Sequence, residues 1–247
     1  MNVFIELVKN DLNISKNRRK FSLWSRIYIG AAFIISFISY TITLIYHKVN
    51  PSFIIIVPAF LTFPIFAVSI SMVKREWRNH TVGWWLSLPY TRTMLLASKL
   101  TAGIIRTLKL LGILALVSLA FWFEGMLLRP DLWNNFDTTG CLLQSCFMYG
   151  IVLLLCPSLL CFGMLLSLLR RSKWRPATPL ACVLFPILTS FSFPKLFSGN
   201  EDFNQAWETF SLSGSYGILL LGAAASLLLA LVMFFLSVYI LEKQVEI

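Results

Sequence analysis

The side chains best suited to metal or acid–base chemistry are few and widely separated. The two histidines, His47 and His80, lie on opposite sides of the membrane in the topology derived below, so no shared metal site is expected. The sequence contains no HExxH zinc motif and no carboxylate pair within an apolar stretch. It also lacks the GxxxxGK[ST] motif, so the chain is not expected to bind a nucleotide through a P-loop of its own.

One acidic residue, Glu124, stands near the end of a long apolar stretch. Ionisable groups inside a membrane commonly mark the route of an ion or a substrate, because their burial is otherwise unfavourable. Glu124 is therefore a candidate pathway residue, with an ordinary residue of the membrane interface as the alternative. A proton relay would need more such groups, which argues against a proton-coupled transporter.

The most specific chemistry lies in residues 74–99, KREWRNHTVGWWLSLPYTRTMLLASK, between two apolar stretches. The pattern predicts a basic helical segment that carries Glu76, then a short amphipathic stretch that ends at Pro89. A second helix should begin after Thr91, whose side chain can cap it. We expect Trp84, Trp85 and Leu86 to form an apolar surface. That surface would serve either as part of the aromatic belt of the membrane interface or as a docking site for a soluble partner.

The elements around this segment are predicted to be membrane-spanning helices. Of 247 residues, 57% are hydrophobic and 13% are charged, whereas soluble domains have about 25% charged residues. Six mostly uncharged stretches are long enough for the roughly 20 residues that a spanning helix needs. They are residues 25–46, 51–73, 107–128, 142–169, 176–193 and 217–241. The predicted fold is a single all-α, polytopic transmembrane domain over residues 1–247.

The distribution of basic residues predicts the orientation. All but three of the 21 lysines and arginines fall in the N-terminal segment, in the links after the second and fourth spans, or at the C-terminus. Only Lys48, Arg129 and Lys195 lie on the other side. By the positive-inside rule, both termini are therefore cytoplasmic. The formal charge of +10 then reflects topology and contact with anionic membrane lipid, and no nucleic-acid partner is expected.

The N-terminal segment, residues 1–20, is predicted to form a helix in the cytoplasmic membrane interface. Phe4, Leu7, Val8 and Leu12 recur at helical spacing and would form one apolar face.

The sequence resembles the ABC-2 type exporter permeases, the membrane subunits of bacterial ATP-driven exporters. The resemblance is carried by the spacing of Glu76, Thr81, Leu86, Ser87, Pro89, Arg92 and Lys99, together with the interfacial helix and the six spans. Trp84 and Trp85 depart from the family pattern, in which a smaller acidic or aliphatic residue is common. The resemblance implies a coupling region at residues 74–106 and an outer loop at residues 194–214 that re-enters the membrane.

For function, the resemblance implies a multi-pass permease in the bacterial cytoplasmic membrane without a nucleotide site or catalytic activity of its own. Two copies of a P-loop ATPase subunit would bind ATP and Mg, and a second permease, identical or homologous, would complete the transporter. The coupling interface with the ATPase would comprise Glu76, Thr81, Trp84, Trp85, Leu86, Ser87, Pro89, Arg92 and Lys99.

The uncharged spans favour a lipophilic or amphipathic cargo that moves outward, such as a peptide antibiotic, a lipid-like molecule or a drug. The short chain and the lack of a large outer domain resemble the permeases of antimicrobial-peptide exporters and of bacterial self-immunity. Two other functions remain open. A membrane scaffold or sensor could dock an ATPase without transport, whereas an intramembrane enzyme would need paired histidine and acidic residues at membrane depth.

Overall fold

The computed structural model describes residues 3–18, 23–47, 58, 61–128, 138–184 and 216–243. Within these ranges the fold is all-helical, as the sequence predicts. The elements are α1 (Val3–Arg18), α2 (Leu23–His47), α3 (Thr62–Arg78), α4 (Val82–Ser87), α5 (Arg92–Leu128), α7 (Thr138–Leu169), the 3-10 turn η2 (Arg175–Ala177) and α11 (Tyr216–Lys243).

Three of the described helices are long and apolar enough to cross a membrane: α5, the Ser145–Leu169 part of α7 and the Leu221–Lys243 part of α11. They contain most or all of the spans expected at residues 107–128, 142–169 and 217–241. Helix α2 covers the expected span at residues 25–46, with a shorter apolar section at Ile34–Thr43.

The other expected spans are described only in part. Helix α3 starts at Thr62 and continues five residues beyond the expected end at residue 73. Of the expected span at residues 176–193, the structure describes a helix over residues 178–184. The first part of the expected span at residues 51–73, apart from residue 58, and the expected re-entrant loop at residues 194–214 lie outside the described residues.

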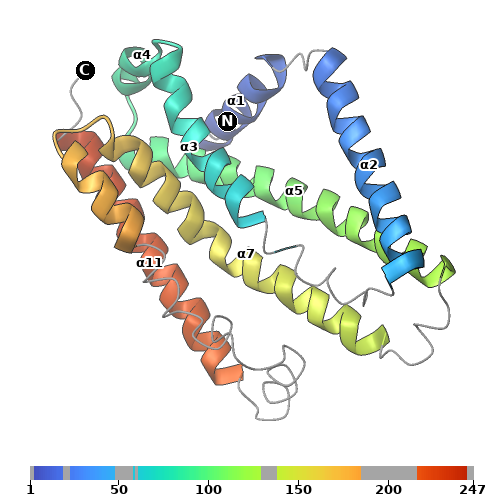
Figure 1. Ribbon diagram of the computed structural model, residues 1–247. Helices are drawn as coiled ribbons and strands as arrows, with labels where there is room; N and C mark the ends of the chain where they lie inside the picture. The colour runs from blue at the N-terminus through green and yellow to red at the C-terminus, as the bar shows by residue number, and fades with distance from the viewer. Residues whose placement is uncertain are drawn as a thin grey trace.

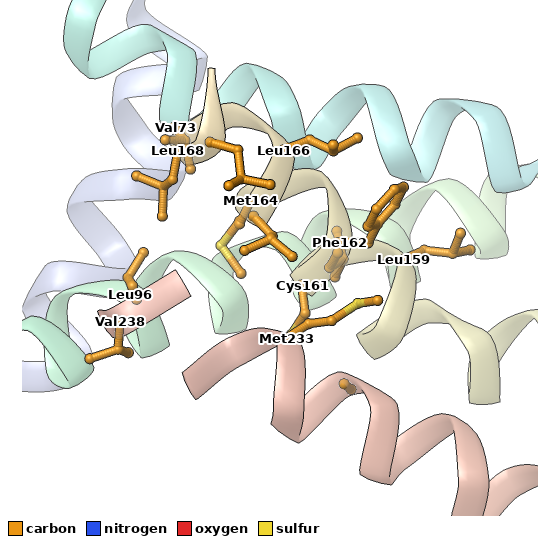
Figure 2. Close-up of a cluster of buried hydrophobic side chains, with 14 of the residues drawn as sticks. Val73, Leu96, Leu159, Cys161, Phe162, Met164, Leu166, Leu168, Met233 and Val238 are labelled. Carbon is orange, nitrogen blue, oxygen red and sulfur yellow. The ribbon is translucent and has the colours of Figure 1, made fainter. Parts of the chain in front are cut away.

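Helix α7 occupies the centre of the bundle, between α3 and α11 (Figure 1). Its sequence is apolar on all sides, which is typical of a helix surrounded by protein. Accordingly, 78% of the most apolar 18-residue stretch of α7 is buried inside the structure, whereas the corresponding share for α5 is 11%. Figure 2 shows the core that results, with side chains from four helices. The labelled residues include Val73 from α3, Leu96 from α5, Met164 and Leu168 from α7, and Met233 and Val238 from α11.

Helices α3 and α7 approach each other closely at Gly163. A Cβ atom added to Gly163 would lie 2.7 Å from the Cβ of Ser69, closer than side-chain carbons approach in proteins. The Ser69 hydroxyl donates a hydrogen bond to the backbone carbonyl of Leu160 at the same crossing. Small residues and interhelical hydrogen bonds are the usual means of packing helices tightly within a membrane.

Helix α1 packs its apolar face on the bundle. Val8 is buried beside Met72 of α3 and Ala102 of α5, and Phe4 and Leu12 pack around these three residues. The amphipathic helix expected from the N-terminal sequence is therefore confirmed, and its apolar face contacts protein. Its position in the membrane interface stays a prediction.

Candidate functional site

A capped turn ends α3 and places Glu76 and Thr81 together. The backbone N–H of Thr81 donates to the carbonyl of Glu76 at 3.0 Å, and that of His80 donates to Trp77 at 3.1 Å. This pair of bonds is the Schellman motif, in which the residue after the C-cap adopts a left-handed conformation. His80 does so, with a φ of 55°. The motif brings the Thr81 hydroxyl to the Glu76 side chain, where it donates to Oε2 at 2.7 Å. The five-residue spacing of Glu76 and Thr81 thus has a local structural cause.

Helix α4 is held against the bundle by its own apolar residues and by Arg92. Val82 and Leu86, one helical turn apart, are both buried in the main core. The guanidinium of Arg92 donates to the backbone carbonyl of Leu86. The N–H of Met94 donates to the Thr91 hydroxyl at 3.3 Å, which confirms Thr91 as the cap of α5.

An ionic cluster that is largely shielded from solvent joins α1, α3 and α5. The ammonium Nζ of Lys99 on α5 lies 2.7 Å from Oε1 of Glu76 on α3 and 3.1 Å from Oδ1 of Asp11 on α1. The Lys99 side chain is 2% exposed and both carboxylates are 14% exposed. Arg106 also donates to the backbone carbonyl of Asp11. We call Asp11, Glu76, Thr81, Lys99 and Arg106 the Lys99 cluster.

The electrostatic balance of the Lys99 cluster is uneven at Asp11. Burial raises the pKa of the Asp11 carboxyl above its ordinary value, since the charged form loses its hydration. The Lys99 charge and hydrogen bond oppose this shift, and the neighbouring Glu76 charge adds to it. Two carboxylates therefore compete for one ammonium group. Removal of Lys99 would leave both without their close cationic partner.

The structure brings some of the predicted coupling residues together and separates others. Glu76, Thr81 and Lys99 meet in the Lys99 cluster, and Arg92 contacts the backbone of Leu86. Ser87 and Pro89 are exposed. Trp84 and Trp85 lie on α4, but their side chains are outside the described residues.

Leu86 differs from the expectation of an exposed apolar surface. It is 7% exposed, because α4 is short and needs an inward face to pack at all. Leu86 therefore anchors α4, and the exposed face must be formed by other positions.

Two members of the Lys99 cluster were not anticipated from the sequence. Asp11 lies 88 positions before Lys99, and Arg106 lies 95 positions after Asp11. The one local signal is that Asp11 is an acidic residue between the apolar residues Val8 and Leu12 of α1. No sequence spacing links it to Lys99.

The candidate pathway residue Glu124 joins α5 to α2. One carboxyl oxygen, Oε1, accepts a hydrogen bond from the Thr41 hydroxyl, which also lies 2.9 Å from the Phe37 carbonyl. The other oxygen, Oε2, is buried and has no hydrogen-bond partner among the residues that the structure describes. Tyr40 packs edge-on against Phe121 nearby, with 5.2 Å between ring centroids. The Glu124 carboxyl group thus lies beside aromatic side chains and hydrogen-bonds to α2.

Comparison with known proteins assigns the chain to a family. A family model described as "ABC-2 family transporter protein" matches residues 8–205, which includes most of α1, the Lys99 cluster, α4 and Glu124. No curated protein and no solved structure gives a significant match to the chain. Because the family match covers most of the chain, the protein belongs to the ABC-2 family of transporter membrane proteins.

Proposed function

We propose that the chain is the permease subunit of an ATP-driven exporter in the bacterial cytoplasmic membrane. In this proposal six helices cross the membrane, both termini are cytoplasmic, and α1 lies in the cytoplasmic interface. Two copies of a separate P-loop ATPase bind ATP and Mg and hydrolyse the ATP. A second permease, identical or homologous, completes the transport pathway. The family assignment and the distribution of basic residues support this arrangement.

The observation that carries the proposal is the attachment of α4 to the bundle. Helix α4 lies at one end of the bundle, near the C-terminal end of α3 and the start of α5 (Figure 1). Arg92 binds its last turn, and the Lys99 cluster joins the two helices on either side of it to α1. A force applied to α4 would therefore move α1, α3 and α5 as one unit.

The proposed mechanism uses this unit as a lever. ATP closes the two ATPase subunits, which draws the two α4 helices of the transporter together. The motion passes through α3 and α5 to the membrane-spanning part of the bundle and changes the side to which the cargo site opens. ATP can drive this change only because it binds one of the two states more tightly.

The cargo is proposed to be lipophilic or amphipathic, such as a peptide antibiotic, a lipid-like molecule or a drug. Helix α7 contains no charged residue, and α11 contains none before Glu242. Glu124 would then supply a single polar contact in the pathway, through the carboxyl oxygen that lacks a partner among the described residues. An antimicrobial peptide with one basic group would suit this combination.

Copurification of the ATPase tests the proposed coupling surface. Gly83 is an exposed residue of α4, and a Cβ added there meets no atom within 4 Å. Gly83→Leu should therefore leave the fold intact while it obstructs a partner that docks on α4. Gly112→Leu on α5 is a matched control, since Gly112 is exposed and a Cβ there also meets nothing within 4 Å.

The chain would be purified in mild detergent from its native host, and its partners would be identified by mass spectrometry. We expect a stoichiometric P-loop ATPase with the wild type and with Gly112→Leu, and much less with Gly83→Leu. Trp85→Ala and Glu76→Ala should also weaken the association. Equal recovery from all variants would exclude α4 as the docking surface. A bound ATPase whose hydrolysis does not respond to any lipophilic cargo in proteoliposomes would favour the sensor function.

A further inference from the structure

A pocket with a strongly basic rim lies between the ends of α3 and α7. Its volume is about 660 Å³, and its lining comes from both helices and from the turn that follows α7. Four cationic residues line it: Lys74, Arg170, Arg171 and Arg175. Among the residues that the structure describes, no acidic one lines it. The pocket is separate from the Lys99 cluster, which shares none of its lining residues.

These four cations are available to a ligand. All four are exposed, and none forms an ion pair with another residue in the part of the chain that the structure describes. Four positive charges around one cavity repel one another, so a bound anion would relieve an unfavourable interaction. The pocket is thus electrostatically prepared for a polyanionic or strongly anionic group.

Backbone hydrogen bonds hold the three arginines in a defined turn. The N–H of Arg171 donates to the carbonyl of Leu168 at 2.9 Å, and the N–H of Arg175 donates to Ser172 at 3.1 Å. The Thr178 hydroxyl donates to the Arg175 carbonyl at 2.8 Å. A turn with this many internal bonds presents its side chains with little loss of backbone entropy on binding.

The rest of the lining has an apolar part, and Ser167 and Thr178 complete it. Ile70 and Trp77 of α3 and Leu166 of α7 form this part, directly beside the cationic residues. The apolar helix segment Ser145–Leu169 of α7 ends one residue before the first arginine. The pocket therefore lies where the apolar part of α7 gives way to the basic residues that follow it.

We propose that this pocket binds the headgroup of an anionic phospholipid. Arginine side chains pair with phosphate through two parallel hydrogen bonds, and basic pockets at the cytoplasmic ends of spanning helices suit such headgroups. The apolar lining accepts the first part of an acyl chain, which a free phosphate or an acidic peptide does not have. The lipid thereby bridges α3 and the turn after α7. This connection uses none of the residues that join α4 to the Lys99 cluster.

Native mass spectrometry of the full chain in detergent tests this site. The probes are phosphatidylglycerol and phosphatidylcholine with the same acyl chains. The test variant is the triple substitution Arg170→Gln, Arg171→Gln and Arg175→Gln. The control is Lys9→Gln, Lys109→Gln and Lys243→Gln, which removes three exposed charges elsewhere. Lys74→Gln, on the opposite wall of the pocket, is a second test that leaves the turn unchanged.

The wild type and the control should bind phosphatidylglycerol at least about tenfold more tightly than phosphatidylcholine. The arginine triple variant should lose this preference, and Lys74→Gln should reduce it. Equal binding of the two lipids by the wild type would overturn the proposal, as would an unchanged preference in both test variants. Displacement of the lipid by millimolar inorganic phosphate would instead assign the pocket to a free anion. Loss of the ATPase from the triple variant with unchanged lipid binding would assign it to a protein partner.

Discussion

The Nζ atom of Lys99 lies 2.7 Å from Oε1 of Glu76, a buried contact that joins the first turns of α5 to the end of α3. The same ammonium group reaches Asp11 of α1 at 3.1 Å. The Lys99 ammonium group therefore joins three helices that are separate in the sequence. Since α4 lies between Glu76 and Lys99 in the chain, this contact also closes the segment that carries α4.

Removal of the shared charge should strongly destabilise the protein. Lys99→Met retains most of the side-chain volume but leaves two largely buried carboxylates without their ammonium partner. We expect the free energy of unfolding to fall by about 3–5 kcal/mol. Denaturant unfolding in detergent measures this loss. Lys109→Met removes an exposed lysine from the same helix and should have little effect. Similar losses from the two substitutions would contradict a special role for Lys99.

The Asp11 carboxyl should make stability depend on pH. Its folded-state pKa lies above the ordinary value of 3.8, so the folded protein binds the proton more tightly than the unfolded chain does. The resulting contribution is complete below pH 3.8 and is lost as the pH rises through the folded-state pKa. We therefore expect the thermal midpoint to decrease as the pH is raised from about 4, and expect Asp11→Asn to weaken this dependence.

Glu6→Gln provides the comparison for Asp11, because Glu6 is an exposed acid on the same helix. Its pH profile should match that of the wild type. If Asp11→Asn also retained the wild-type profile, the burial of the Asp11 carboxyl would not contribute to stability.

The close approach of α3 and α7 should make Gly163 intolerant of a side chain. The added methyl group of Gly163→Ala would meet the Cβ of Ser69 at 2.7 Å, so the helices must separate. We expect a loss of about 1–3 kcal/mol. Gly103→Ala is the matched control, since its new Cβ would find Leu160 at an ordinary contact distance of 3.4 Å. A thermal shift assay in detergent distinguishes the two, and equal midpoints would count against the tight crossing.

The hydrogen bond from Thr41 to Glu124 should stabilise the contact between α2 and α5. Thr41→Val removes the hydroxyl with almost no change in shape, and we expect a loss of about 0.6–1.7 kcal/mol. Thr43→Val is the control, because it removes only a hydrogen bond to the Ser39 carbonyl within α2 and leaves the contact with α5 unchanged. A double-mutant cycle with Glu124→Gln isolates the coupling between the two side chains. A coupling energy of zero would mean that the Thr41–Glu124 contact contributes nothing to stability.

Cysteine labelling should establish the orientation. In a background without the five native cysteines, Ser87→Cys should react with a membrane-impermeant thiol reagent only after permeabilisation. Leu128→Cys, at the far end of α5, should react in intact cells. Both positions are exposed. Ser172, in the turn after α7, is only 8% exposed, so a cysteine there would escape labelling on either side of the membrane. The reverse labelling pattern would refute cytoplasmic termini.

Much of the local structure is predictable from the sequence because its causes are local. The apolar stretches predict α2, α5, α7 and α11, since hydrophobicity and length are properties of a continuous segment. Thr91 is recognisable as the cap of α5 because a cap bonds to a residue three positions away. The spacing of Glu76 and Thr81 likewise matches one capping motif at the end of α3.

The tertiary structure alone decides which distant residues meet. Asp11 reaches Lys99 only because the apolar face of α1 packs on α3 and α5, and Leu86 turns inward only because the core offers it space. The basic pocket forms because the packing of α3 on α7 places Lys74 beside the turn that follows α7. Helix formation depends on neighbouring residues in the chain, whereas these contacts depend on how whole helices pack, so their partners cannot be read from spacing.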